Sequence, residues 1–275
     1  MSAPVQRYDE RAHDALRKIR ASFNTFGYAP GSVLFEMGRT KVLCAVGMQP
    51  GVPHFLKGQQ RGWLTAEYAM LPTSTGVRSQ RDSSSAAKNG RSVEISRFIA
   101  RCLRTVIDFE KLGERTIVVD CDVLQADAGT RTACITGAAL ALRVAVDKWM
   151  ADRVISGDIL KSSLAAVSVG WVNGQPLLDL DFSEDGRADA DFNIVMTDTG
   201  NLVEIQGAVE GSTLTWDQFE QLRSLAVRGI EDLFKECNAL TGIQTSRSSH
   251  ATAQQKTKRD TGGMFSLGNR LNSAV

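Results

Sequence analysis

The chain changes from an extended to a helical pattern within Asp120–Thr132, whose sequence is Asp-Cys-Asp-Val-Leu-Gln-Ala-Asp-Ala-Gly-Thr-Arg-Thr. The β-branched run Thr116–Val119 before it predicts a strand, and the Ala- and Leu-rich run Ala133–Met150 after it predicts a helix. Gly129 and Thr130 are therefore expected where the helix begins. Because the first turn of a helix leaves backbone N–H groups unpaired, such a corner is suited to bind an anion, phosphate most readily.

Arg131 supports this interpretation, since a guanidinium can pair with two phosphate oxygens at once. Gly and Thr also occur at strand-to-helix junctions for turn and capping reasons alone, so the corner by itself is either an anion site or an ordinary cap. It lacks the Gly-Lys-Ser/Thr ending of a P-loop and the three spaced glycines of a dinucleotide-binding fingerprint.

Length and composition indicate a globular protein with no general affinity for polyanions. The 275 residues suffice for one large domain or two small ones. The net charge of +1 predicts no bulk attraction to nucleic acid, so any such contact must come from local clusters of Arg and Lys. No apolar run approaches the length of a membrane span, and the polar N-terminus is not typical of a secretory signal. We therefore expect a cytoplasmic protein without a membrane partner.

The cysteine and histidine content excludes several kinds of site. The five cysteines are never spaced as Cys-x-x-Cys, which predicts reduced packing residues of a cytosolic protein and no zinc site. With only three histidines, a Ser-His-Asp hydrolase or a His-ligated metal site has little to work with. Arginines and carboxylates must then carry any chemistry. The cysteines are Cys44, Cys102, Cys121, Cys134 and Cys237.

The first half of the chain predicts strands followed by a helix. Ser32–Glu36 and Lys41–Val46 alternate apolar and polar residues around Gly38, as a hairpin does. Trp63–Met70 predicts another strand, and Pro72–Gly90 a polar surface loop. The next helix is predicted from apolar residues at helical spacing: Val93, Ile95, Phe98, Ile99, Cys102, Leu103, Val106 and Ile107.

The second half predicts two strand pairs and a closing helix. Asn173-Gly174 between alternating segments is a strong hairpin signal, and Thr215 with Gln218 forms a capping box at the start of the last helix. The expected segments are the strands Ser163–Val172 and Pro176–Phe182, an acidic loop Ser183–Ala190, and the strands Asp191–Thr197 and Leu202–Val209. This order predicts an α+β or mixed α/β domain of two similar halves over residues 1–242. Residues 243–275 are expected to be a polar, disordered tail, which either touches RNA or has no specific role.

Two further charged clusters could carry chemistry. Arg78, Arg81 and Arg91 lie in or just after the polar loop, where they suit a nucleic-acid backbone or belong to a solvated loop. The acidic cluster could hold Mg²⁺ through oxygen ligands or be a solvated turn. Combined with the anion corner, the clusters favour phosphoryl or nucleotidyl transfer in which a bound small anion attacks. The acidic cluster comprises Asp179, Asp181, Glu184, Asp185, Asp189 and Asp191.

The sequence closely resembles the bacterial RNase PH family of phosphorolytic 3′→5′ exoribonucleases, in order and with few gaps from about Arg20 to Gly242. The resemblance implies the two-layer α+β fold of the RNase PH and ribosomal protein S5 domain 2 type, with two pseudo-repeated halves. The matching segments are Gly31–Glu36, Thr40–Cys44, Gly51–Gly58, Gly62–Tyr68, Met70–Pro72, Gly90–Arg91, Glu94–Ile95, Asp120–Thr132, Ala165–Gly170 and Asn193–Thr197.

The resemblance also implies roles for single residues. Arg91 matches the family's phosphate-binding arginine, and Gly129, Thr130 and Arg131 match its phosphate-binding Gly-Thr-Arg. Asp185 and Asp191 match its two catalytic aspartates, which are expected to hold Mg²⁺. Arg78 and Arg81 match two of three loop arginines that contact tRNA, and Thr73 stands at the third position. Ala69 and Ala128 occupy positions where the family commonly has Gly.

The activity implied is that of a tRNA nucleotidyltransferase that uses inorganic phosphate as co-substrate. Phosphate attacks the last phosphodiester of a tRNA precursor or ribosomal RNA 3′ end and releases a nucleoside 5′-diphosphate, and the reverse reaction adds nucleotides. The family resemblance further implies a homohexamer built as a trimer of dimers. The alternatives are a non-catalytic RNA-binding ring subunit and a metal-dependent nuclease that uses water and releases monophosphates.

Deletion of residues 243–275 should leave the rate of RNA shortening unchanged, because this polar segment offers the core almost no apolar surface. Initial rates of the truncated and full-length chains on one labelled RNA, measured side by side, check this. Complete loss of activity in a truncated chain that still folds would show that the tail belongs to the working enzyme.

Overall fold

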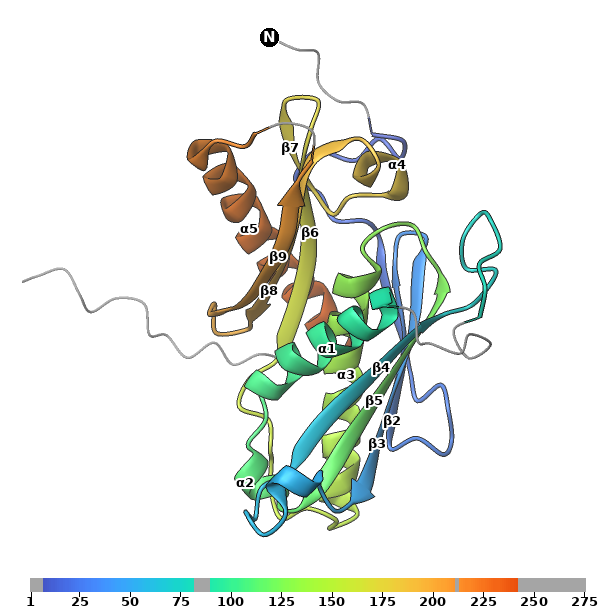
Figure 1. The fold of residues 1–275 in the computed structure, drawn as a ribbon, viewed down its shortest axis with the longest axis vertical. Helices are drawn as coiled ribbons and strands as arrows, with labels where there is room; N and C mark the ends of the chain where they lie inside the picture. Colours follow the sequence, from blue (N-terminus) through green and yellow to red (C-terminus); the bar gives the residue numbers. More distant parts are fainter. Residues whose placement is uncertain (1–6, 82–89, 211–212, 242–275) are drawn as a thin grey trace, which may run out of the picture. The chain divides into compact units, whose positions relative to one another are not determined.

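The computed structural model describes residues 7–81, 90–210 and 213–241 (Figure 1). The first half builds a five-stranded sheet of order β1-β2-β3-β5-β4, antiparallel except for the parallel pair β4–β5. Its elements are β1 (Ile19–Phe23), β2 (Gly31–Met37), β3 (Thr40–Pro50), the 3-10 turn η1 (His54–Leu56), β4 (Trp63–Met70), α1 (Gly90–Thr105), α2 (Phe109–Leu112), β5 (Arg115–Gln125) and α3 (Thr130–Ala151).

The second half builds a four-stranded antiparallel sheet of order β7-β6-β8-β9. The last helix packs on β6 and β7, and α1 packs on β4. The elements are β6 (Leu164–Val172), β7 (Gln175–Leu178), α4 (Phe182–Asp185), β8 (Ala188–Thr197), β9 (Leu202–Val209) and α5 (Trp216–Thr241). The predicted α+β class is confirmed.

Helix α3 is the element that connects the two sheets. It contacts β2 and β3 of the first sheet and β6 of the second, and most of its side chains are buried. From Thr132 to Leu142 every residue of the helix is buried and none is charged, so this part of its sequence suits the interior. Because both sheets pack against this one helix, its N-terminus has a fixed position relative to each of them.

Most predicted elements agree with the structure. The strand Trp63–Met70 and the hairpin around Gly38 are confirmed, and Gly38 has a φ of 61°. The Asn173-Gly174 hairpin is confirmed as well, with both residues at positive φ. The capping box of α5 is present, because Thr215 Oγ1 accepts from the Gln218 N–H and Gln218 Oε1 accepts from the Thr215 N–H.

Three boundaries were predicted wrongly. The strand predicted at Thr116–Val119 continues as β5 to Gln125, because the residues after Val119 go on alternating between exposed and buried positions. The predicted strand Pro176–Phe182 ends at Leu178, because Asp179 adopts a left-handed φ of 55°. The predicted acidic loop Ser183–Ala190 instead contains the end of α4 and the start of β8. The expected tail 243–275, and residues 82–89 of the predicted polar loop, lie outside the described residues.

The predicted packing role of the cysteines is confirmed, since all five thiols are free and buried. Cys44 on β3 and Cys121 on β5 lie opposite each other, with their sulfurs 3.8 Å apart beneath α3. Within the described part of the chain, no helix is long and apolar enough to cross a membrane.

Replacement of Gly31 by Ala should destabilise the fold, because β2 approaches α3 too closely for a side chain. A Cβ at Gly31 would lie 2.2 Å from the Ala141 carbonyl oxygen and 2.5 Å from the Ala145 nitrogen. We expect a loss of about 3 kcal/mol in the free energy of unfolding, measured by urea denaturation. Gly47→Ala is the matched control, since its Cβ would meet nothing within 4 Å and should change stability by less than about 1 kcal/mol. Equal effects of the two substitutions would contradict this account.

Candidate active site

The corner between β5 and α3 has an unusual backbone. Ala128 and Gly129 both have left-handed φ values, 55° and 61°, which turn the chain sharply into the helix. Thr40 holds the turn from the neighbouring hairpin, since its hydroxyl donates to the Ala128 carbonyl (2.7 Å) and accepts from the Asp127 N–H (3.0 Å). Gly129 is the N-cap of α3 and supplies no side-chain hydrogen bond to the first turn. The N-terminal N–H groups are therefore not satisfied by a side-chain cap at Gly129, which favours the anion interpretation over the ordinary cap.

Thr130 is fixed by a residue that the sequence prediction did not assign. Its hydroxyl lies 3.0 Å from the phenolic oxygen of Tyr68 on β4, and both residues are buried. Burial raises the pKa of Tyr68, against the opposing effect of the positive charges of Arg91 and Arg131. The phenol therefore stays protonated at neutral pH and can donate a hydrogen bond beside the corner.

Arg131 extends from the first turn of α3 toward β9 and α1. Its Nη1 donates to Gln206 Oε1 at 2.6 Å, and its Nη2 lies 3.3 Å from Glu94 Oε2. Gln206 in turn donates to Glu94 Oε1 at 2.6 Å. Strand β9 and helix α1 thus orient the guanidinium, and the Glu94 carboxylate competes with any anion that Arg131 binds.

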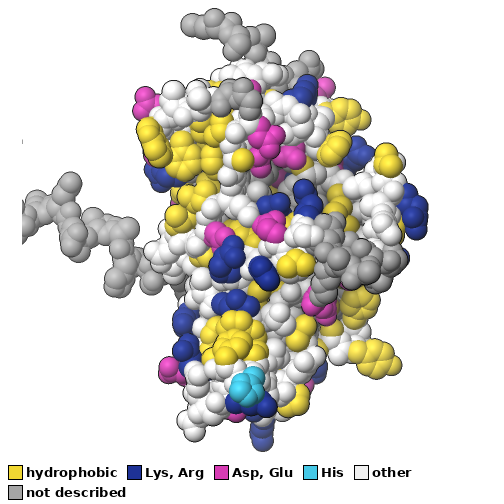
Figure 2. All heavy atoms as spheres, in the orientation of Figure 1, with side chains coloured by type: hydrophobic (Ala, Val, Ile, Leu, Met, Phe, Trp, Pro, Cys, Tyr) yellow, Lys and Arg dark blue, Asp and Glu magenta, His cyan; other side chains and the backbone are white. Residues whose placement is uncertain are grey.

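Asp185 at the end of α4 and Asp191 on β8 lie close enough to affect each other. Desolvation raises the pKa of Asp185, and the negative charge of Asp191 raises it further, while Arg91 and Arg131 oppose the shift. Desolvation also raises the pKa of Asp191, with Glu210 adding to the effect and Arg131 opposing it. The charges of Arg91, Arg131 and Asp191 therefore all act on Asp185, so these side chains lie within electrostatic reach of it. Figure 2 shows basic and acidic side chains next to one another on one face of the molecule.

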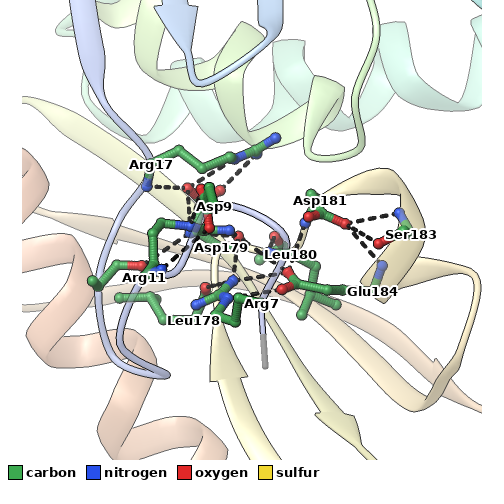
Figure 3. Close-up of polar contacts among 12 residues, drawn as sticks. Arg7, Asp9, Arg11, Arg17, Leu178, Asp179, Leu180, Asp181, Ser183 and Glu184 are labelled. Carbon is green, nitrogen blue, oxygen red and sulfur yellow. Dashed lines mark hydrogen bonds and ion pairs between the residues drawn. The ribbon is translucent and has the colours of Figure 1, made fainter. Parts of the chain in front are cut away.

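Three carboxylates of the acidic cluster make contacts inside the protein, which fits neither a metal site nor a solvated turn at these positions. Asp179 pairs with Arg17, and Glu184 pairs with Arg7, both inside the protein (Figure 3). Asp181 caps α4, accepting from the N–H groups of Ser183 and Glu184. These three carboxylates are structural, and Asp179 and Glu184 are paired with arginines that are far away in the sequence.

Of the three remaining carboxylates of the cluster, Asp185 and Asp191 fit a hard divalent cation. Carboxylate oxygens are the ligands that Mg²⁺ prefers, and two crowded carboxylates with raised pKa values are relieved by a positive charge between them. Among the described residues, no group of three or more His, Cys, Asp or Glu side chains is arranged to hold a metal ion. A cation here would take two protein ligands and complete its shell with water and substrate, as Mg²⁺ commonly does.

The predicted RNA-contacting arginines lie on an exposed segment joined to the corner. Arg78 and Arg81 are exposed, as is Thr73. The Ala126 N–H donates to the Ser74 carbonyl at 2.8 Å, which ties the start of this segment to the end of β5. Desolvation raises the pKa of Asp122 on β5, and the positive charge of Arg81 opposes that rise. Arg81 therefore lies beside the strand that leads into the anion corner.

Glu94→Gln should strengthen the binding of inorganic phosphate, because it removes the negative charge that competes for Arg131. A partly exposed ion pair is worth about 0.2–1 kcal/mol, which predicts an affinity gain of up to about fivefold by isothermal titration calorimetry. Glu204→Gln is the matched control, since Glu204 pairs with Arg101 in another contact between β9 and α1. Unchanged phosphate affinity in Glu94→Gln would place the bound anion away from Arg131.

Solved structures with similar folds include rice Rrp46 and an Archaeoglobus fulgidus exosome. The rice Rrp46 structure matches with a TM-score of 0.69 and 17% identity over 86% of this chain and 100% of that one. The Archaeoglobus fulgidus exosome with RNA bound to the active site matches with a TM-score of 0.70 and 23% identity over 84% of this chain and 92% of that one. At these identities the likeness establishes the fold alone.

Sequence comparisons establish the family. The two domains of the 3′ exoribonuclease family match residues 15–146 and 163–229, one in each half of the structure. Ribonuclease PH of Neisseria meningitidis serogroup C is 50% identical over 232 residues, covering 84% of this chain and 96% of that protein. Ribonuclease PH of Neisseria gonorrhoeae is 49% identical over the same shares. With both domains matched and half of the aligned residues identical, the chain belongs to the RNase PH family of 3′ exoribonucleases.

Proposed function

We propose that the protein shortens RNA from its 3′ end by phosphorolysis, releases nucleoside 5′-diphosphates, and adds nucleotides in the reverse direction. The observation that carries the proposal is the joint placement of two arginines and two aspartates next to a helix N-terminus. Arg91 and Arg131 oppose the pKa rise of Asp185, which requires all three side chains to lie within electrostatic reach. Such a site can hold a phosphate on one side and a phosphodiester on the other.

Orthophosphate would bind between Arg91 and the corner formed by Gly129, Thr130 and Arg131. The Arg131 guanidinium supplies two N–H donors, and the first turn of α3 supplies backbone N–H groups. An oxygen of the bound phosphate forms a bond to the phosphorus of the terminal nucleotide. The bond from that phosphorus to the preceding 3′ oxygen breaks, and that oxygen takes up a proton. Positioning and neutralisation of charge carry most of such a reaction.

Asp185 and Asp191 would hold Mg²⁺ beside the scissile bond. When bound, the ion would supply positive charge to the phosphodiester and to the departing 3′ oxygen. Both carboxylates must be ionised for this role, and Arg91 and Arg131 favour the ionised form of Asp185. The two arginines thus support the aspartates electrostatically while remaining donors to phosphate.

The substrate class is RNA, with tRNA precursors and ribosomal RNA 3′ ends as the proposed members. Exposed Arg78 and Arg81 would contact the backbone of the RNA beside the corner, since guanidinium groups pair with phosphates without reading sequence. Thr73 lacks the charge of a third arginine, so we expect weaker backbone contact at that position. The structurally similar archaeal exosome is described with RNA bound to its active site.

We further propose a cytoplasmic homohexamer built as a trimer of dimers, the assembly implied by the family resemblance. Several large apolar side chains are exposed on the single chain, among them Tyr28, Phe182 and Trp216. Aromatic side chains of this kind are enriched in the buried parts of subunit interfaces. A ring would also bring the loop arginines of several subunits near one RNA end.

Incubation with a body-labelled tRNA precursor and Mg²⁺, with and without inorganic phosphate, tests the reaction. We expect shortening only when phosphate is present, and nucleoside diphosphates as the product on anion-exchange chromatography. Asp185→Asn should lower turnover about a hundredfold or more, because a metal-holding charge is lost. Exposed Glu220, which pairs with Arg223 on α5, provides the control Glu220→Gln with unchanged turnover.

Two results would contradict the proposal. Monophosphates released at full rate without phosphate would identify a hydrolytic nuclease. RNA binding without any turnover would identify a non-catalytic ring subunit.

A further inference from the structure

Arg17, in the segment that precedes β1, contacts both the anion corner and the loop that precedes α4. Its side chain is 3% exposed and lies between the anion corner and the loop that joins β7 to α4 (Figure 3). That loop leads into α4, and Asp185 is the last residue of this helix. Arg17 was assigned no role from the sequence.

The contacts on the loop side are numerous and well aligned. Arg17 donates three hydrogen bonds to the Asp179 carboxylate, from its backbone N–H (2.7 Å), Nε (3.0 Å) and Nη2 (2.7 Å). Asp179 is fully buried and is itself fixed to β6, because its N–H donates to the Ser168 carbonyl at 2.7 Å. The arginine is therefore anchored to a rigid part of the second sheet.

On the corner side, the same guanidinium reaches the backbone before the helix. Arg17 Nη1 donates to the Asp127 carbonyl at 2.5 Å. A Cβ placed on Gly129 would lie 2.9 Å from Arg17 Nη2, so the guanidinium lies directly against the left-handed turn. Asp127 also accepts from the Phe182 N–H at 3.4 Å, a second contact between the corner and the start of α4.

A simple role in stability does not account for this arrangement well. Burying an ion pair has a large desolvation cost, and apolar side chains of similar volume often give equal or greater stability. What a planar guanidinium adds is geometry, since its donors are fixed relative to one another and here contact two separate loops.

We infer that Arg17 is a positioning residue that holds the phosphate-binding corner at a fixed distance from the β7–α4 loop, and through this loop from α4, which ends at Asp185. This inference rests on the proposed function, because it concerns the alignment of phosphate with the metal-holding carboxylate. Arg17 contacts neither reactant itself. It acts through Asp127 and Gly129 on one side and through Asp179 on the other.

Arg7 provides a matched control. It is also 3% exposed and pairs with a buried carboxylate, donating from Nε and Nη2 to the two oxygens of Glu184 at 2.8 Å each. Its other donors go to the carbonyls of Ala12, His13, Leu178 and Asp179. In the described part of the chain Arg7 makes no hydrogen bond to residues 126–131. Arg7 therefore stabilises α4 and the loop before it, whereas Arg17 also contacts the anion corner.

The experiment compares Arg17→Lys with Arg7→Lys in the full-length protein. A lysine keeps the charge but cannot contact Asp179 and Asp127 together in the same geometry. We expect Arg17→Lys to weaken inorganic phosphate binding about tenfold, equivalent to about 1.4 kcal/mol, in calorimetric titrations without RNA. It should also raise the KM for phosphate in the RNA assay by a similar factor. Arg7→Lys should lower kcat without changing either phosphate parameter.

Thermal unfolding followed by circular dichroism identifies a temperature at which each variant is folded, and all titrations are made there. Asp179→Asn provides a second test, since it keeps the shape but weakens the hold on Arg17. Its effect on phosphate affinity should have the same direction and should not add to that of Arg17→Lys.

Wild-type phosphate affinity in folded Arg17→Lys would overturn the inference, and so would an equal loss in Arg7→Lys, which would indicate general loosening. These outcomes leave the proposed function intact if the wild-type protein remains phosphate-dependent. Failure of the wild-type protein to bind phosphate would overturn both.

Discussion

The burial of most of α3 between the two sheets is the constraint on which the site depends. The helix packs against β2 and β3 in one sheet and against β6 in the other, so rotating or shifting it would disrupt contacts with both sheets. Its first turn therefore presents Thr130 and Arg131 in one orientation to the second half of the chain. Left-handed Ala128 and Gly129 let β5 enter the helix at this point, and Thr40 holds their backbone from a third segment. A polar site thus rests on a helix that is mostly buried among apolar side chains.

The charges around this helix end are divided between structure and chemistry. The acidic run after β7 contains more carboxylates than one metal site needs, and the structure pairs Asp179 and Glu184 with buried arginines. Asp185 and Asp191 keep no such partner among the ion pairs of the described residues, and their pKa values rise accordingly. The positive charges that oppose this rise are those of Arg91 and Arg131 at Asp185 and of Arg131 at Asp191, and these arginines are also the groups suited to hold phosphate. The arginines therefore reduce the free-energy cost of keeping the two aspartates ionised.

Sequence reasoning predicted what depends on local pattern. The strand Trp63–Met70 follows from alternation, and the start of α3 follows from the change to a helical pattern at Gly129 and Thr130. Sequence reasoning could not separate the structural carboxylates of the acidic cluster from those of the candidate site, because the arginine partners of Glu184 and Asp179 lie 177 and 162 residues away. The placement of Tyr68 was missed for a related reason. An alternating strand shows which side chains are buried, whereas a hydrogen bond to Thr130 depends on how β4 and α3 pack.

The same distinction explains why the arginines before β1 gave no signal. A segment with Arg and Asp close together is typical of a solvated surface, and composition alone places such residues in water. Here the segment lies against the β7–α4 loop, so Arg7 and Arg17 are buried and donate hydrogen bonds to carboxylate and carbonyl oxygens (Figure 3). The desolvation cost of two buried guanidinium groups is offset only when geometry and pairing are both good. Such a network resists small displacements of either loop, and a reaction between a bound anion and a phosphodiester depends on the distance between those loops.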